Sequence, residues 1–401
     1  MFETLDTLTP ESILGLLVAF RADPAPQKID LGVGVYRNEQ GITPVMKAVR
    51  LAEQAVHADQ DSKAYLGLMG NDVFNTSICN LVLGAGHAAL ASARARAFQA
   101  PGGCGALRLG AELIRRAGGA GTVVHVSDPT WANHVPLLTG AGIRIASYPY
   151  YDASTGDLRF QAMLDYLDAL SPGAVVLLHG SCHNPTGADL SRAQWQTLVE
   201  VLARRQLLPF IDLAYQGLGE GLEADALGAR LVAETLPEAL IAISCSKNFG
   251  LYRERVGALI VVSREATQLE AAMSHLRAIA RSIYSMPPDH GAAVVARILG
   301  NASLAELWRN ELSQMQTRMR TLRTDLTRAL GVACPDRDFS AIARQHGMFS
   351  LLNLSSGAVD HLRRQHHIYM PSSGRINVAG LDPNSIAVLS AAIAALPSQV
   401  R

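Results

Sequence analysis

The sequence predicts an α/β protein in which a mostly parallel sheet forms a large domain and a smaller α+β unit follows it. Short β-rich runs alternate with helical patterns, as in parallel strands joined by helical crossovers. Most of these runs are almost continuously apolar, which is typical of strands covered on both faces. The chain has 401 residues, 49% of them hydrophobic and 17% charged, which predicts two or three units with a well-filled core.

Five runs have the character of buried strands: 122–127, 174–179, 208–213, 240–244 and 256–262. Between the second and the third we predict a helix over 191–205, because apolar residues recur at helical spacing after a capping box of Ser191 and Gln194. These elements make one βαβ unit. Upstream, the alanine-rich stretch at 88–97 is also predicted as a helix.

A longer helical stripe runs over residues 303–330, and a second capping box, Ser303 with Glu306, marks its start. Such a helix would span about 42 Å, which is longer than a small domain is wide, so it is predicted to link two domains. A strand over 348–353 and a final helix over 383–396 then complete the smaller unit.

Composition argues against several classes of function. The 35 basic and 35 acidic side chains give a formal net charge of zero, so no overall field attracts nucleic acid or a membrane surface. The longest apolar run, over 386–396, is too short to span a membrane, and the acidic N-terminus lacks the features of a secretory signal, so we expect a cytoplasmic protein.

Five cysteines without a CxxC pair indicate reduced thiols. His179 and His183 lack an HExxH pattern, so no metal is expected there.

Lysine is scarce in this chain. Only four of the 35 basic residues are lysines, and Lys247 is the one that follows a predicted buried strand. An amine in a low-dielectric site has a lowered pKa and can form a Schiff base with a carbonyl cofactor. The alternative is a lysine that caps a surface turn. Asp212 ends a neighbouring apolar strand, where a carboxylate needs a cation such as a protonated pyridine nitrogen or an arginine.

A glycine-rich segment at 101–105 precedes a helical pattern. Backbone amides at such a helix start can bind a phosphate, although an ordinary glycine turn has the same signature and no GKS or GKT motif is present. Ser244 and Arg255 flank Lys247 and could add donors to a phosphate. A lysine, an acid, a phosphate-ready loop and donors at successive strand ends together favour pyridoxal 5'-phosphate (PLP) as the cofactor.

Three motifs carry a resemblance to a known family: His183-Asn-Pro-Thr-Gly187, Asp212-Leu-Ala-Tyr215 and Ser244-Cys-Ser-Lys-Asn-Phe-Gly-Leu-Tyr-Arg-Glu-Arg-Val-Gly257. In this order they resemble class I PLP-dependent aminotransferases of the aspartate/aromatic amino acid subgroup. Further matches are Gly347-Met-Phe349 and Ser373-Gly-Arg-Ile-Asn-Val-Ala-Gly380. The resemblance implies fold type I, with a large PLP-binding domain over 44–312 and a small domain made of an N-terminal arm, 1–43, and residues 313–401.

The resemblance also implies which residues hold the cofactor. Lys247 would form the Schiff base and then move a proton between substrate and cofactor. Asp212, supported by His134 and His179, would keep the pyridine nitrogen protonated, and Trp131 would stack on the ring. The other implied contacts are Gly103, Cys104, Asn184, Tyr215, Ser244, Arg255 and, from the second subunit of a homodimer with shared active sites, Tyr65.

Substrate contacts follow from the same resemblance. Arg375 would hold the α-carboxylate with help from Gly34 and Asn184, because a guanidinium binds a carboxylate through two parallel donors. Arg281 would reach across the dimer to the side-chain carboxylate of a dicarboxylic substrate. Small-molecule amino acids and 2-oxo acids are therefore the expected partners, with aspartate and glutamate as the first-choice donors in a ping-pong reaction.

Three departures from the aspartate enzymes bear on specificity. Cys104 replaces a hydroxyl residue beside the phosphate, Met286 replaces a usually polar residue, and Ala64 stands where asparagine is usual. These changes would make the pocket more apolar and roomier. The alternative to an enzyme that prefers aspartate and glutamate is therefore an aromatic amino acid aminotransferase or a specialised biosynthetic paralogue. A β-decarboxylase or lyase on the same fold and a non-catalytic binding protein are more remote. The residues that instead resemble the aspartate branch are Val35, Arg37 and Thr43.

Overall fold

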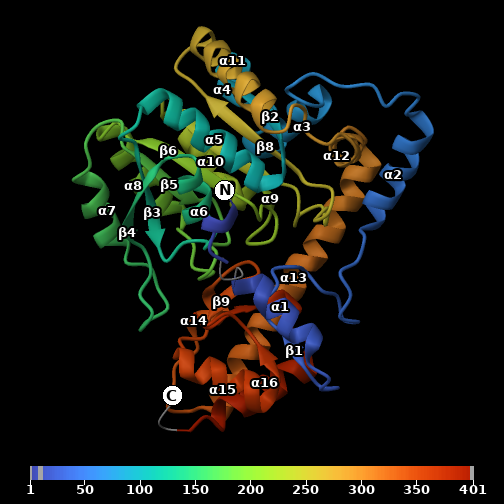
Figure 1. Cartoon of the computed structure of the whole chain (residues 1–401), viewed down its shortest axis with the longest axis vertical. Coiled ribbons are helices and arrows are strands. Elements are labelled where there is room, and N and C mark those ends of the chain that lie inside the picture. Colours follow the sequence, from blue (N-terminus) through green and yellow to red (C-terminus); the bar gives the residue numbers. More distant parts are fainter. Residues whose placement is uncertain (1, 8–11, 398–401) are drawn as a thin grey trace.

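A seven-stranded sheet is the centre of the molecule in the computed structural model, which describes residues 2–7 and 12–397 (Figure 1). Its strands are β2 (Ala95–Pro101), β3 (Val123–Asp128), β4 (Arg144–Pro149), β5 (Val175–His179), β6 (Leu208–Leu213), β7 (Ala239–Ser244) and β8 (Val256–Val262). They lie in the order β2-β8-β7-β6-β5-β3-β4. β8 pairs antiparallel with both β2 and β7, and the other neighbouring strands of this sheet pair in parallel, so the sheet is mostly parallel, as predicted.

The central strands are the most deeply buried. Every residue of β7 and β8 is buried, and so is all of β6 except Leu208. Helices on both faces exclude water from these strands, which explains why their sequences are continuously apolar. The predicted strands 208–213 and 256–262 coincide with β6 and β8, and the other three predictions for this sheet agree within one residue at each end.

Eleven helices belong to this larger part of the chain: α2 (Lys47–Asp59), α3 (Asp72–Leu83), α4 (Ala88–Ala91), α5 (Gly102–Gly118), α6 (His134–Gly140), α7 (Phe160–Asp168), α8 (Arg192–Arg204), α9 (Leu222–Asp225), α10 (Leu227–Thr235), α11 (Ala266–Ile283) and α12 (His290–Leu299). The predicted capping box at the start of α8 is confirmed, with Ser191 and Gln194 each accepting the other's backbone N–H. In the described ranges, no helix combines the length and apolar character that crossing a bilayer requires.

The prediction of a helix over 88–97 is wrong beyond Ala91, where α4 ends. β2 begins at Ala95 and pairs with β8 along seven residues, and Ala97 and Phe98 are fully buried there. Burial and sheet pairing thus outweigh the helix propensity of alanine. The sequence analysis also missed β4, an edge strand whose largely unburied residues give no clear apolar period.

The long helix α13 (Ala302–Ala333) crosses from the larger part of the molecule into a smaller one (Figure 1). Its 32 residues span about 48 Å, so the predicted linking helix is confirmed and is longer than expected. The capping box predicted for Ser303 is wrong. Asn301 caps the helix by accepting the Leu304 N–H at 3.0 Å, and Ser303 already lies inside the first turn.

The smaller part combines segments from near both ends of the described chain: α1 (Ser12–Ala22), β1 (Ile29–Asp30), α14 (Ala341–Arg344), β9 (Phe349–Leu351), α15 (Ser356–His366), β10 (Ile368–Tyr369), β11 (Arg375–Asn377), η2 (Val378–Gly380) and α16 (Pro383–Ala394). The short η1 (Phe2–Thr4) is exposed. β1 pairs with β10 in parallel, and β11 pairs with β9 in antiparallel fashion. This part has a core of its own around Leu326, Ile376 and Leu389. The domain limits at 43/44 and 312/313 stay a prediction, and residues 1, 8–11 and 398–401 of those domains lie outside the described ranges.

Candidate active site

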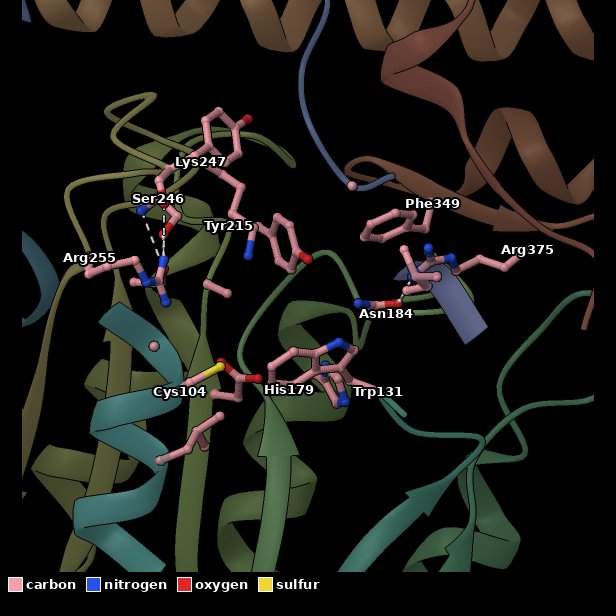
Figure 2. A pocket seen from close by; sticks show the side chains of 18 residues that line it. Cys104, Trp131, His179, Asn184, Tyr215, Ser246, Lys247, Arg255, Phe349 and Arg375 are labelled. Carbon is pink, nitrogen blue, oxygen red and sulfur yellow. Dashed lines mark hydrogen bonds between the residues drawn. The ribbon is translucent and has the colours of Figure 1, made fainter. Parts of the chain in front are cut away.

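A cavity of about 290 Å³ opens where the parallel strands end and the smaller part of the molecule meets the sheet (Figure 2). Loops that follow parallel strands converge at this edge of an α/β sheet. The predicted site residues that line the cavity are Gly34, Gly103, Cys104, Trp131, His179, Asn184, Asp212, Tyr215, Ser244, Lys247, Arg255 and Arg375. The fold therefore brings together nearly all of the residues that the sequence analysis selected.

Lys247 lies three residues beyond the end of β7, and it lines the cavity. Because β8 returns antiparallel, with Ser244 paired to Gly257, the connecting loop brings Arg255 to the same edge. Desolvation lowers the pKa of Lys247 below its usual value, although the Asp212 carboxylate acts in the opposite sense. The amine therefore gives up its proton more readily than a surface lysine does.

Asp212 is the last but one residue of β6 and pairs with His179 of β5. One carboxylate oxygen lies 3.0 Å from His134 Nε2, and His134 Nδ1 lies 2.8 Å from Thr130 Oγ1. Burial raises the pKa of Asp212, but the hydrogen bond and the charges around it outweigh burial, so the pKa lies below the usual value. Asp212 is therefore an ionised carboxylate suited to a cationic partner in the cavity.

The first turn of α5 and the Arg255 side chain form an anion cradle, by which we mean Gly102, Gly103, Ser244, Ser246 and Arg255. Arg255 Nη1 donates to Ser246 Oγ at 3.2 Å. A Cβ atom at Gly102 would overlap Arg255 Nη2, and one at Gly103 would lie 3.0 Å from Ser244 Cβ. The missing side chains keep this space open. Helix amides, a guanidinium and hydroxyl groups are the donors that a phosphate requires.

Arg375 lies at the opposite end of the cavity, on β11, with only 5% of its surface exposed (Figure 2). It donates to Asn184 Oδ1 at 3.3 Å and also to Gly32 O. The Phe349 ring covers its guanidinium, with 4.3 Å from Cζ to the ring centre. A Cβ atom at Gly34 would lie 2.7 Å from Phe349 Cζ, so glycine leaves room for this ring. A guanidinium oriented in this way suits a carboxylate.

Tyr65 and Arg281 are the predicted site residues that do not line the cavity. The Tyr65 side chain is 93% exposed, and Arg281 is exposed at the end of α11, where it donates to Ser285 Oγ at 2.5 Å. The Leu66 N–H group lies 2.9 Å from Met286 Sδ, so the two segments meet on the surface. That Tyr65 and Arg281 bind phosphate and substrate in the site of a second subunit stays a prediction.

Comparison with known proteins identifies the family. The model of the family described as aminotransferase class I and II matches residues 26–393. The chain belongs to this family. Over 384 residues it is 47% identical to the aromatic-amino-acid aminotransferase of Pseudomonas aeruginosa, with 96% of each chain covered. It is 43% identical to the aspartate aminotransferase of Escherichia coli, with 99% of this chain and 100% of the relative covered.

The fold is shared with solved aminotransferases. The crystal structure of an aromatic-amino-acid aminotransferase from Burkholderia pseudomallei, covalently bound to pyridoxal phosphate, has a TM-score of 0.95 to this chain at 43% identity. The match covers 98% of this chain and 99% of that one. The protein is therefore a PLP-dependent aminotransferase of fold type I, as the sequence analysis predicted.

The cavity of this aminotransferase suits PLP in three respects. The anion cradle offers donors to a phosphate, the Asp212 carboxylate matches a protonated pyridine nitrogen, and the Lys247 amine matches the carbonyl carbon. Trp131 supplies an aromatic surface at the base of the view in Figure 2. Cys104 is the exception among the donors, because its thiol is a weak hydrogen-bonding group and lies 3.7 Å from Asn133 Nδ2.

Several residues of the aminotransferase cavity were not predicted as site residues. Phe349 belongs to the Gly347-Met-Phe motif, which was noticed without a role being given to it. Ser246 and Tyr252 lie inside the Lys247 motif, so their proximity to Lys247 was a usable signal. Ile13 and Leu107 also line the cavity. Ile13 lies in a segment, Ile13-Leu-Gly-Leu16, that also resembles the family, but no role was assigned to it because only folding brings α1 to the ends of the strands.

Proposed function

We propose that this aminotransferase exchanges the amino group between an L-amino acid, with aspartate and glutamate preferred, and a 2-oxo acid in a ping-pong reaction. The observation that carries the proposal is that the Lys247 amine, the Asp212 carboxylate and the Arg375 guanidinium line one cavity. They suit, in turn, the carbonyl of the cofactor, its ring nitrogen and the α-carboxylate of the substrate.

Proton transfer is assigned to Lys247. PLP, when bound, withdraws electrons from the substrate Cα and so makes its proton acidic. The lowered pKa of Lys247, caused by desolvation, leaves the amine able to accept that proton and return it. Asp212, held by His134 at 3.0 Å, keeps a proton on the ring nitrogen. Burial raises the pKa of Tyr215, so the phenol stays protonated and, together with Asn184, orients the cofactor oxygen beside it.

The remaining roles concern binding. Trp131, which lines the cavity, would stack on the cofactor ring. Arg375 would bind the α-carboxylate with help from Asn184, to which it donates, and from the Gly34 backbone. A carboxylate held at this end places Cα toward Lys247, which is the geometry that proton transfer requires. Gly103, Cys104, Ser244 and Arg255 line the cavity and would hold the phosphate within the chain.

We further propose a cytoplasmic homodimer in which each subunit completes the site of the other. Tyr65 is 93% exposed, so its side chain is accessible to a second subunit. Tyr65 would then contact the partner's phosphate, and Arg281 would bind the side-chain carboxylate of a dicarboxylic substrate there. We also propose that 1–43 and 313–401 form the small domain beside the PLP-binding domain at 44–312.

Aromatic amino acids are the second candidate substrates. Ile13, Leu107, Trp131 and Phe349 give the cavity an apolar wall, which suits a ring better than a carboxylate. The Pseudomonas aeruginosa relative at 47% identity is named for aromatic amino acids, whereas the Escherichia coli relative at 43% is named for aspartate. Both relatives are named as aminotransferases, and their names differ only in the side chain of the amino acid.

The test is a panel of half-reactions. The PLP-loaded enzyme is mixed with aspartate, glutamate, phenylalanine, tyrosine or alanine, and the absorbance of the pyridoxal chromophore is followed. We expect the fastest change with aspartate and glutamate, and formation of oxaloacetate from aspartate. A faster change with phenylalanine or tyrosine would instead establish the aromatic alternative. Carbon dioxide release from aspartate without oxaloacetate would indicate a β-decarboxylase, and no change with any donor would refute the proposed transfer.

A further inference from the structure

Arg323 is a buried cation in the middle of an apolar helix face. It lies on α13 between the buried residues Met319, Leu322 and Leu326, and only 2% of its surface is exposed. A guanidinium is costly to bury unless its donors are satisfied. Its position is therefore informative about what it binds.

One short segment, residues 342–350, satisfies the Arg323 guanidinium. The acceptors, each with its shortest distance to an Arg323 nitrogen, are Ile342 O (3.1 Å), His346 O (3.0 Å), Gly347 O (2.8 Å), Phe349 O (2.6 Å) and Ser350 Oγ (2.6 Å). The planar fork of an arginine can hold several acceptors at once, which a single ammonium group cannot do in the same geometry. Arg323 thus holds the backbone of this segment from the side of α13.

Phe349 is the residue of this segment that reaches the active site. Its carbonyl accepts from Arg323 at 2.6 Å, while its ring lies 4.3 Å from Arg375 Cζ and 6.1 Å, edge to face, from the Tyr215 ring. Phe349 also pairs with Asn377 across β9 and β11, the strand that carries Arg375. A shift of the Phe349 backbone would therefore move the wall that orients the Arg375 guanidinium.

The same guanidinium lies beside the loop that carries Asn184. A Cβ atom at Gly187 would overlap Phe349 O and lie 3.1 Å from Arg323 Nη2. The His346 N–H group donates to Gly187 O at 2.7 Å, and Asn184 itself accepts from Arg375 at 3.3 Å. Phe349 and Asn184 both contact Arg375, and the backbone segments that carry these two residues meet at Arg323.

We propose that Arg323 is a positioning residue for substrate binding. By holding the carbonyls of His346, Gly347 and Phe349, it sets the position of the Phe349 ring against Arg375 and thereby the affinity for the substrate carboxylate. The proposal rests on the proposed role of Arg375. Arg323 does not line the cavity itself, so it acts through the segment that it holds.

The test compares Arg323→Met, which keeps much of the side-chain volume but removes every donor, with Arg323→Lys. For the holoenzyme of Arg323→Met we expect KM for the amino acid to rise about tenfold, while kcat per PLP-loaded site stays within about twofold. Arg323→Lys should recover part of the loss in KM. Hydrogen exchange adds a readout that is independent of turnover, because the His346 amide should exchange faster in Arg323→Met than in the parent.

Arg318→Met is the matched control on the same helix. Arg318 donates to Leu381 O at 2.9 Å and lies over the Tyr36 ring, so its loss should lower the melting temperature without raising KM. Ser350→Ala removes one acceptor of Arg323 and keeps the test open if Arg323→Met does not fold; it should raise KM by a smaller factor.

An unchanged KM in a folded Arg323→Met or Ser350→Ala enzyme would overturn the proposal, and so would an equal rise in KM in Arg318→Met. The parent enzyme in the same assay separates the two claims. If the parent does not transaminate, the proposed function fails; if it does and KM is unaffected by the variants, only the role of Arg323 fails.

Discussion

Lys247 owes its proposed chemistry to its position. Of the four lysines, it is the one that lines the cavity: Lys28 donates to two backbone carbonyls of the N-terminal segment, and Lys47 and Lys63 are exposed. Desolvation at the end of β7 lowers the pKa of Lys247, and Asp212 lies near enough to act on it. A surface lysine would be protonated and unreactive under the same conditions.

Replacement of this lysine should abolish turnover. We expect Lys247→Ala to lower kcat by about a thousandfold or more, because the amine proposed to move the substrate proton is lost. Lys47→Ala removes an exposed lysine and should retain parental kcat. Steady-state rates with the best donor of the panel measure both variants, with circular dichroism to confirm folding. A Lys247→Ala enzyme with full turnover would refute the mechanism.

His179 should make the stability of the enzyme depend on pH. Burial holds its pKa at about 3, far below the usual value. As the pH falls through about 6.5 the unfolded chain binds a proton at this residue while the folded chain does not, so the folded state loses stability relative to the unfolded state. We therefore expect the parent to have a higher melting temperature than His179→Gln. This difference should be smaller at about pH 5 than at about pH 7.5.

The parent enzyme, measured at each pH, is the reference for this titration. A difference in melting temperature between the parent and His179→Gln that stays constant over the range would show that this histidine has the same pKa in both states.

Helix α5 is suited to bind an anion because its first turn lies close to Arg255. Gly102 opens the helix at φ +73° and Gly119 follows it at φ +78°, so both adopt a backbone conformation that favours glycine. They differ in their surroundings. A Cβ atom at Gly102 would overlap Arg255 Nη2, whereas one at Gly119 would meet no atom within 4 Å.

This pair allows backbone strain to be separated from the anion cradle. Gly102→Ala and Gly119→Ala should both lower the melting temperature, because each forces alanine to a positive φ. Only Gly102→Ala should weaken PLP binding, by about tenfold or more, since it displaces Arg255. Titration of the cofactor-free proteins with PLP, followed by absorbance, measures the two dissociation constants. Equal affinities in the two variants would show that the cradle does not hold the cofactor.

The two capping boxes show how far local patterns predict elements. The same sequence signature marks Ser191 and Ser303, yet only Ser191 caps a helix. The two sites differ because Asn301 precedes Ser303 and already caps α13 by accepting the Leu304 N–H group, one of the free amides of its first turn. Buried strands such as β6 were predicted to the residue, whereas the first three residues of β2 were assigned to a helix because the burial of this strand depends on β8, more than 150 residues later.

Shared active sites would make dimerisation a condition of activity. Tyr65 and Arg281 are exposed in the single chain, and their segments meet at Leu66 and Met286. One surface therefore presents both residues proposed to complete a partner's site. The aminotransferase should accordingly lose turnover of dicarboxylic substrates when it is diluted to monomers.

A hybrid dimer tests this arrangement directly. Lys247→Ala and Arg281→Ala homodimers should each turn over aspartate poorly. In a hybrid, one site combines an intact Lys247 with an intact Arg281 from the other subunit, so a random mixture should recover about a quarter of the parental activity. The measurement is aspartate turnover after joint unfolding and refolding. No recovery, in a mixture shown to contain hybrids, would place Arg281 outside the partner's site.

The cofactor end of the site was predictable from sequence because its parts are close along the chain. Ser244, Lys247 and Arg255 belong to one hairpin between β7 and β8, and a short motif carries all three. The substrate end was not predictable in the same way without the family resemblance. Asn184 and Arg375 are 191 residues apart, and Phe349, which covers Arg375, is held through its carbonyl by Arg323 from yet another segment. Local patterns encode strand ends and caps, whereas contacts between distant segments arise only when α13 and the smaller part pack against the sheet.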